Sequence, residues 1–180
     1  MVFLLTANFV VKMKPKIHES SFVAKNAVII GNVKIGKNCG IYPCAVIRGD
    51  QNSIEIGDGS NIQDGCVIHC DEKNNVKIGK NVTIGHCAMV HGAIIEDDCL
   101  IGIHATVLDG ARIKRGSIIA ANALVKTDME VPENSLVIGV PGKIIKQDEK
   151  NKEKARLNAE IYKKISKTHK ERKHSWYVPE

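Results

Sequence analysis

Histidine is the residue type whose placement in this chain most directly suggests chemistry. Four of the seven histidines, His69, His86, His91 and His104, fall in a middle stretch that is otherwise rich in small aliphatic residues and glycine. Three neutral imidazoles around one zinc ion leave a fourth position open for water. An ion held in this way makes its bound water acidic near neutral pH. The histidines therefore indicate a candidate catalytic metal site.

A repeat of six residues indicates the elements that must hold these histidines. Large aliphatic residues recur at a spacing of six, and a small or β-branched residue stands four positions after most of them. This period fits neither the roughly 3.6-residue turn of an α-helix nor the alternation of a single strand. It predicts short strands joined by turns, with about three hexads to a coil and each aliphatic side chain directed inward. The repeated aliphatic positions are Ile35, Ile41, Ile47, Ile56, Ile62, Ile68, Ile78 and Ile84, and then, after a slip near Met89, Ile95, Ile101, Val107, Ile113, Ile119 and Val125.

The composition agrees with a narrow interior. No Phe, Tyr or Trp stands between Tyr42 and Tyr162, and the glycines all lie in the repeat region and shortly beyond it. We therefore predict an all-β solenoid, a triangular prism of parallel strands whose coils bury their aliphatic side chains against one another. The hexads from Ile30 to Val125 correspond to roughly five coils.

A coil of roughly 18 residues determines how the histidines are arranged. His86 and His104 are expected to stack on consecutive coils, with His69 nearly in line with them. His91 follows His86 by five residues and is expected about one face further round the prism. A single prism does not bring His69, His86 and His91 to one point in this arrangement. A trimer does, if a corner of one molecule meets a face of the next.

The end of the chain has a different character. From Asp148 to Lys173 there is no glycine or proline, and good helix formers dominate. Leu157, Ile161 and Ile165 are spaced by four, with Tyr162 beside them, which predicts an apolar stripe on a helix. This stripe is expected to pack on the prism wall or on a neighbouring subunit. The predicted organisation is an N-terminal extension over 1–16, a β-helix domain over 17–147, and a basic amphipathic helix and tail over 148–180.

Several other classes of protein are disfavoured. The net charge of +6 is concentrated in the tail, where acidic residues are interleaved with basic ones and no nucleic-acid-reading motif appears. The apolar N-terminal run M-V-F-L-L-T-A-N-F-V-V (1–11) has no basic residue before it and no convincing cleavage site after it, and it is too short to span a membrane. The six cysteines form no CxxC pair, and we expect reduced thiols. We therefore predict a cytoplasmic protein that binds neither nucleic acid nor membrane.

Four segments resemble the gamma-class carbonic anhydrase family: V-I-R-G-D (46–50), S-N-I-Q-D-G (60–65), V-I-H (67–69) and T-I-G-H-C-A-M-V-H-G (83–92). The similarity extends from about Ile17 to Lys146. It implies a left-handed parallel β-helix of hexapeptide repeats that assembles as a homotrimer. The implied activity is the reversible hydration of carbon dioxide to bicarbonate by a metal-bound hydroxide at the trimer interface.

The resemblance also assigns roles to individual residues. His69, His86 and His91 match the metal ligands, two from one subunit and one from its neighbour. Gln63 matches the side chain that orients the hydroxide, and Asn61 matches a second polar group beside the hydroxide and bicarbonate. Arg48 and Asp64 match an ion pair across the interface, with Asp50 holding the arginine. Zn²⁺ is the expected metal, and the same three imidazoles also accept Fe²⁺ or Co²⁺.

The proton route departs from the fast members of the family, which carry glutamates as proton shuttles. This chain has Gln51 and Asn52 after Asp50, and Asp71 and Glu72 are the acids available in the turn after His69. We therefore expect slow turnover. His104 is a second departure, and we expect a partly buried imidazole there.

Two other functions remain open on sequence grounds. One is a hexapeptide-repeat acyltransferase that uses acyl-CoA and a histidine as general base. The set of three histidines and the lack of an obvious substrate-binding insertion count against it. The other is a metal-binding scaffold protein with little catalytic activity, which the sequence does not separate from the enzyme.

Overall fold

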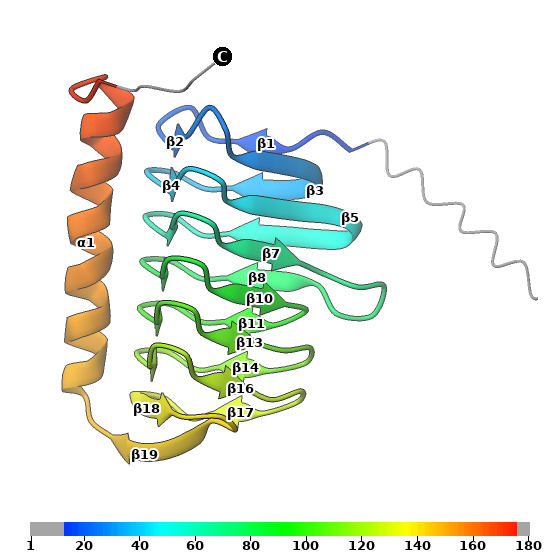
Figure 1. The fold of residues 1–180 in the computed structure, drawn as a ribbon, viewed down its shortest axis with the longest axis vertical. Helices are drawn as coiled ribbons and strands as arrows, with labels where there is room; N and C mark the ends of the chain where they lie inside the picture. Colours follow the sequence, from blue (N-terminus) through cyan, green and yellow to red (C-terminus); the bar gives the residue numbers. More distant parts are fainter. Residues whose placement is uncertain (1–12, 176–180) are drawn as a thin grey trace, which may run out of the picture.

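The computed structural model describes residues 13–175. The chain winds into a parallel left-handed β-helix of about seven turns, and a helix runs along its side (Figure 1). This confirms the predicted fold class. The solenoid is longer than the five coils predicted, because it begins before Ile30 and continues after Val125. Residues 1–12, which belong to the predicted N-terminal extension, lie outside the described residues.

The strands form three faces of a prism, and within each face consecutive coils pair in parallel. The face that we call the histidine face contains β7 (Val67–His69), β10 (Met89–His91), β13 (Thr106–Val107) and β16 (Leu124–Val125). A second face contains β1 (Lys16–Ile17), β8 (Val76–Ile78), β11 (Ile94–Ile95), β14 (Arg112–Ile113) and β17 (Glu130–Val131). The longer strands β3 (Val28–Ile35) and β5 (Val46–Ile56) bend round the corner between these two faces.

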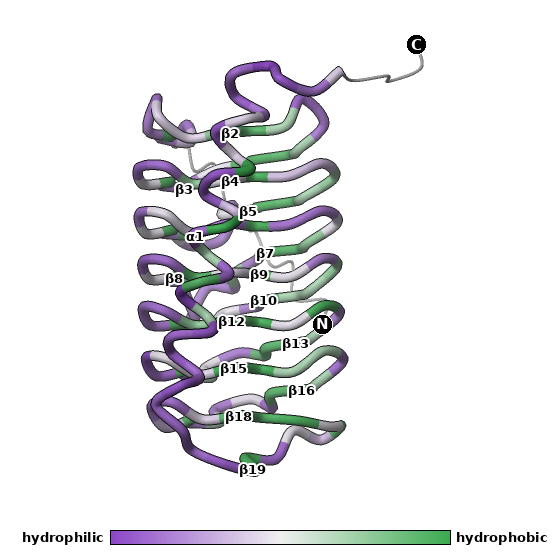
Figure 2. Tube along the Cα trace, turned by 90° about the vertical axis from the view of Figure 1, so that its left-hand side faces the viewer, coloured by the Kyte–Doolittle hydropathy of each residue, from purple (hydrophilic) through white to green (hydrophobic). Residues whose placement is uncertain are grey.

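The remaining face, which we call the helix face, carries α1 (Lys150–Lys170). Figure 2 shows this helix crossing the stacked coils. The last strand, β19 (Lys143–Gln147), pairs antiparallel with β18 (Ser135–Ile138) and closes the C-terminal end of the solenoid. The strands of the helix face are β2 (Phe22–Val23), β4 (Gly40–Ile41), β6 (Asn61–Ile62), β9 (Thr83–Ile84), β12 (Leu100–Ile101), β15 (Ile118–Ile119), β18 (Ser135–Ile138) and β19 (Lys143–Gln147).

The core confirms the interpretation of the repeat. The predicted inward aliphatics are all buried, and the small residues that follow them, such as Cys39, Ala45 and Ala105, fill the corners. The interior cluster consists of isoleucine, valine, alanine and cysteine side chains. Phe22 and Tyr42 instead form a separate cluster, against which Tyr162 and Ile165 of α1 pack. These three aromatic side chains thus lie between the solenoid wall and the helix, where there is room for rings.

The predicted apolar stripe on the helix is only partly correct. Tyr162 and Ile165 do pack against the solenoid, but Leu157 and Ile161 are 64% and 46% exposed. The residues of α1 that are buried are mostly small: Asn151, Ala155, Ala159 and Ser166. Small side chains allow the helix to approach the flat wall closely, and this packing outweighs the burial of the larger aliphatics.

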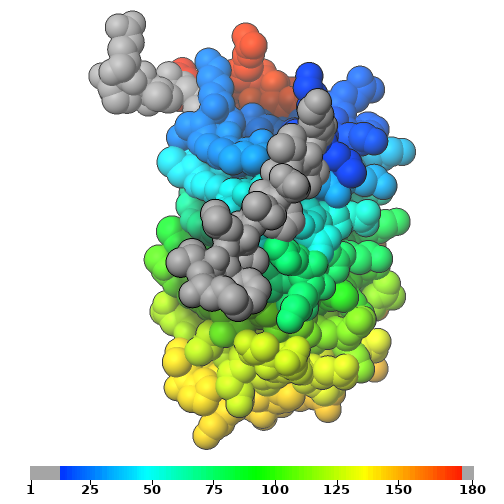
Figure 3. Space-filling model, turned by 90° about the vertical axis from the view of Figure 1, so that its right-hand side faces the viewer, coloured from blue at the N-terminus to red at the C-terminus, as the bar shows by residue number. Residues whose placement is uncertain are grey.

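One corner of the prism departs from the six-residue repeat on three consecutive coils. In register, Ile47, Ile68 and Val90 stack on the histidine face, and Ile56, Ile78 and Ile95 stack on the next face. On these three coils the aliphatic before the corner and the one after it are therefore nine, ten and five positions apart instead of six. We call it the irregular corner and define it as residues 48–53, 69–75 and 91–93. Figure 3 views the stack of coils from the side opposite that of Figure 2.

Within residues 13–175, no helix is both long enough and apolar enough to cross a membrane.

Candidate metal site

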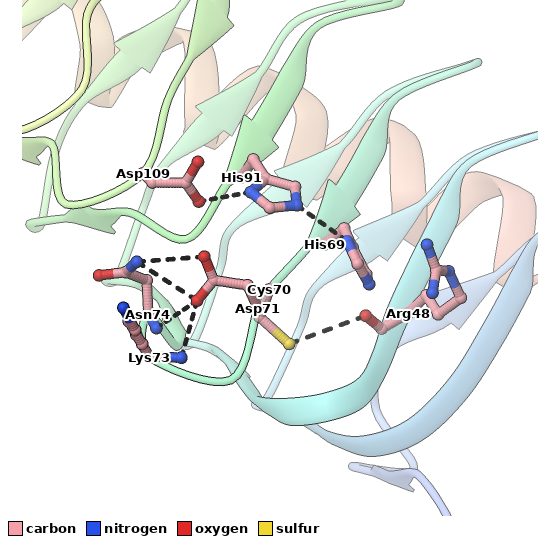
Figure 4. Close-up of polar contacts among 8 residues, drawn as sticks. All are labelled: Arg48, His69, Cys70, Asp71, Lys73, Asn74, His91 and Asp109. Atoms are coloured by element: carbon pink, nitrogen blue, oxygen red, sulfur yellow. Dashed lines mark hydrogen bonds and ion pairs between the residues drawn. The ribbon is translucent and has the colours of Figure 1, made fainter. Parts of the chain in front are cut away.

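His69 and His91 lie side by side at the irregular corner. They are register partners at the ends of β7 and β10, and His69 Nδ1 is 2.9 Å from His91 Nε2 (Figure 4). The longer path round the corner after His69 spaces the two residues by 22 positions rather than 18. The expectation that His69 aligns with His86 is therefore wrong, because His69 stacks on His91.

Each of these rings uses its other nitrogen on a carboxylate. His69 Nε2 is 3.1 Å from Asp50 Oδ1, and His91 Nδ1 is 2.5 Å from Asp109 Oδ1. If both rings donate these protons, the two nitrogens that face one another each present a lone pair. Two such lone pairs repel each other unless a cation lies beside them, so these two tautomers together favour a bound cation.

His86 lies on a different corner, in the turn between β9 and β10. Its Nδ1 is 2.9 Å from Asp64 Oδ2, and its Nε2 is 3.3 Å from the hydroxyl of Tyr162 on α1. Within the described part of one chain, the group with metal-ligand spacing comprises Asp71, His91 and Asp109, without His86. One subunit therefore brings together two of the three histidines singled out from the sequence.

Gln63 and Asn61 are buried beside this turn. Gln63 Oε1 accepts the main-chain N–H of His86 at 3.1 Å, and Gln63 Nε2 donates to Asn61 Oδ1 at 3.1 Å. Asn61 in turn donates to Thr83 Oγ1 at 2.9 Å. A carboxamide has two N–H donors, and the bond to Asn61 uses one of those of Gln63. The network fixes the main chain that carries His86.

The charged residues predicted for an interface pair make other contacts within one subunit. Arg48 Nη1 is 2.6 Å from Asp50 Oδ2, while Asp64 contacts His86. Burial by itself would raise the pKa of Asp50, but the hydrogen bonds from Arg48 and His69 outweigh it and lower this pKa. Asp50 is therefore ionised at neutral pH. The side chains of Arg48 and Asp64 are 40% and 47% exposed, which leaves both accessible to another subunit.

The turn after His69 holds its acid firmly. Asp71 Oδ1 accepts the main-chain N–H groups of Lys73 and Asn74 at 2.8 and 2.6 Å (Figure 4). These bonds, above all the one from Asn74, lower the pKa of Asp71. Its carboxylate is thus a structural acceptor in the turn, and it also lies near His91.

Sequence reasoning missed two contacts and misjudged a third residue. Asp109 and Tyr162, which meet His91 and His86, were not among the predicted site residues. For Asp109 a signal was present, since it stands 18 residues after His91, about one coil along the chain. His104 was expected to be partly buried, but it is exposed, with φ at 56° in its turn. Its main chain does stack on that of His86, to whose carbonyl oxygen it donates.

The donor set fits a divalent cation that prefers nitrogen ligands. Two imidazole nitrogens converge, and the opposite nitrogen of each ring meets a carboxylate, the pattern that orients histidines at metal sites. Imidazole ligands suit zinc, iron and cobalt rather than magnesium or calcium.

Comparisons with known proteins agree with the fold. The family model for bacterial transferase hexapeptide repeats (six repeats) matches residues 14–49 and 92–127. A probable carbonic anhydrase of Methanocaldococcus jannaschii is 47% identical over 147 residues, which cover 81% of this chain and 92% of that protein. Gamma carbonic anhydrase 2, mitochondrial, of Arabidopsis thaliana is 39% identical over 139 residues, which cover 74% of this chain and 50% of that protein.

Other similar proteins carry different names. The carnitine operon protein CaiE of Salmonella agona is 35% identical over 155 residues, which cover 84% of this chain and 77% of that protein. The crystal structure of a putative acetyltransferase from Bacillus cereus superposes with a TM-score of 0.84 at 34% identity, covering 88% of this chain and 92% of that chain. Since the identity to a carbonic anhydrase spans most of both chains, this protein belongs to the gamma-class carbonic anhydrase family of hexapeptide-repeat proteins.

Proposed function

We propose that this protein catalyses the reversible hydration of carbon dioxide to bicarbonate at a metal site shared between subunits of a homotrimer. His69 and His91 of one subunit and His86 of its neighbour would hold the metal. The observation that carries the proposal is the pair of converging imidazoles backed by carboxylates, in a chain 47% identical to a probable carbonic anhydrase.

The surface around the histidines supports a shared site. Val28, Val67 and Met89 stand in one ladder on the histidine face and are 45%, 36% and 41% exposed. On the corner that carries His86, Ile103 is 48% exposed. Covering such apolar surface favours association. Seating this corner against the histidine face of a neighbour would bring the third imidazole to the other two.

The chemistry of hydration needs an ionised water next to the carbon of the substrate. A zinc ion held by three neutral imidazoles supplies this by lowering the pKa of its bound water to about 7. Gln63 and Asn61 sit beside the turn of His86 and would orient the reacting groups with their amide donors. Arg48 of one subunit and Asp64 of the next would pair across the interface, so that charges half-exposed in the single chain are paired in the trimer.

Proton release is expected to limit the rate. Asp71 is the acid closest to His91 in the turn, but its lowered pKa makes it a weak base at neutral pH. A group of this kind relays protons inefficiently, because efficient relays have pKa values near the working pH. The expected enzyme is therefore slower than one with a dedicated shuttle.

The direct test is stopped-flow hydration of carbon dioxide by protein purified without oxygen, with metal content measured on the same sample. We expect a rate proportional to bound zinc or iron, with about one metal per histidine set. Fully loaded protein that does not hydrate carbon dioxide would contradict the proposal. An acyl-transfer assay with acetyl-CoA on that same sample would then distinguish a transferase from a metal-binding scaffold.

A further inference from the structure

We propose that Asp109 is a positioning residue for the metal site, acting through His91. Its carboxylate accepts the proton of His91 Nδ1, which fixes the tautomer and orientation of the ring so that Nε2 presents its lone pair toward His69. This inference rests on the proposed role of His91 as a metal ligand. It assigns a function to a residue that lies one coil away from the sequence motifs.

The contact between the two side chains is short and sheltered. The distance from His91 Nδ1 to Asp109 Oδ1 is 2.5 Å, and the side chains are 28% and 32% exposed. Figure 4 shows Asp109, His91 and His69 in a line, with the ring of His91 in the middle. A carboxylate that accepts the second N–H of a ligand histidine raises the basicity of the ring and limits its rotation.

The main chain holds Asp109 in place from both sides. Its carbonyl oxygen accepts the N–H of Asp128 at 2.9 Å, and the next residue, Gly110, donates to the carbonyl oxygen of Gly92 at 2.8 Å. The carboxylate is therefore carried by the regular stacking of coils. This fixed support suits a group that must keep a histidine in one orientation.

Gly92 provides the space through which Asp109 reaches His91. A Cβ atom at position 92 would lie 2.4 Å from Asp109 Oδ1, closer than non-bonded atoms approach. Gly92 also has φ at +52°, a conformation that costs other residues free energy. The glycine directly after His91 thus permits the contact between the ring and the carboxylate.

The carboxylate that contacts His69 has a second partner. Asp50 lies 3.1 Å from His69 and also bonds Arg48 at 2.6 Å, so its charge is shared with a guanidinium. We therefore expect the removal of Asp109 to affect metal affinity through His91 alone, whereas Asp50 also holds Arg48.

The test is the zinc affinity of the full-length protein, measured by competition with a chromogenic chelator. We expect Asp109→Ala to bind zinc about ten- to a hundredfold more weakly than wild type. Asp109→Asn should lose less, since its amide oxygen still accepts a hydrogen bond, and it keeps the shape of the side chain if the alanine variant does not fold.

A matched control is available at another corner. Asp58, like Asp109, is followed by a glycine with positive φ, but its Oδ1 accepts the main-chain N–H of Lys37 at 2.7 Å. Asp58→Ala should therefore lower the melting temperature while leaving zinc affinity unchanged. Asp71→Asn should also leave it unchanged; equal weakening in that variant and in Asp109→Asn would contradict positioning and point to carboxylates that bind the metal directly.

A spectroscopic readout separates positioning from a merely structural role. In zinc-loaded protein with ¹⁵N-labelled histidine, the Nδ1–H of His91 should give a slowly exchanging signal that is weakened in Asp109→Asn. Wild-type zinc affinity in Asp109→Ala would overturn this inference while leaving the proposed function intact. Failure of the wild-type protein to bind zinc would instead remove the proposed function.

Discussion

At the scale of single residues, each candidate ligand depends on a partner for its second ring nitrogen. Asp50, Asp64 and Asp109 serve His69, His86 and His91 respectively. Asp50 and Asp64 belong to motifs readable in the sequence, where both were assigned to contacts with Arg48. The third, Asp109, lies outside those motifs. Its spacing of 18 residues from His91, about one coil, is the only sequence signal for it.

Gln63 gives a prediction at this scale. Gln63→Ala removes the acceptor for the His86 main chain and one member of the buried amide network. We expect metal content to stay near the wild-type value and the hydration rate to fall about tenfold to a hundredfold, because a misplaced orienting group is costly. Metal analysis and stopped-flow assays on the same sample measure the two effects, and an unchanged rate would remove Gln63 from the mechanism.

At the scale of elements, the packing of α1 shows what a sequence pattern conveys and what it leaves open. The absence of glycine and proline was enough to predict the helix, which spans Lys150–Lys170. Its buried face was predicted incorrectly in part, since hydrophobic spacing favours large residues such as Leu157. The wall of a β-helix is flat, and small residues such as Ala155 and Ala159 fit it more closely.

Tyr42 ties this helix to the first coils and makes its attachment sensitive to alkaline pH. Its hydroxyl is 3.0 Å from Ser166 Oγ, and burial raises its pKa to about 12 from the usual 10.0. A group whose pKa is higher in the folded state than in the unfolded state stabilises the fold at pH values below its unfolded-state pKa. This stabilisation is lost as the pH rises through the folded-state pKa. The stability of wild type should therefore fall between about pH 10 and pH 12.

The comparison with Tyr42→Phe isolates this effect. The buried thiols of Cys66 and Cys99 also have raised pKa values, about 12, and they contribute equally to both proteins. In urea titrations the wild-type free energy of unfolding should fall by about 2 kcal/mol more than that of the variant over this interval. Parallel profiles for the two proteins would show that Tyr42 does not ionise on unfolding as described.

At the scale of the whole molecule, the six-residue repeat predicted the architecture because each hexad contributes one strand and one corner. The same regularity explains why the irregular corner stands out, with coils that depart from the repeat where His69 and His91 lie. Within one chain His86 remains on another corner, next to Asp64 and Tyr162. In the proposed trimer, a second subunit supplies the third histidine.

Mixing two defective variants tests whether the metal site is shared between subunits. His86→Ala and His91→Ala homotrimers should each lack a complete ligand set and should bind little metal. When the two are unfolded together and refolded, a histidine face from one variant can meet the intact His86 of the other, which restores about one quarter of the sites under random mixing. Recovery of zinc binding and hydration to that extent is the predicted result. Mixed trimers, verified by native mass spectrometry, that recover neither would contradict a site shared between subunits.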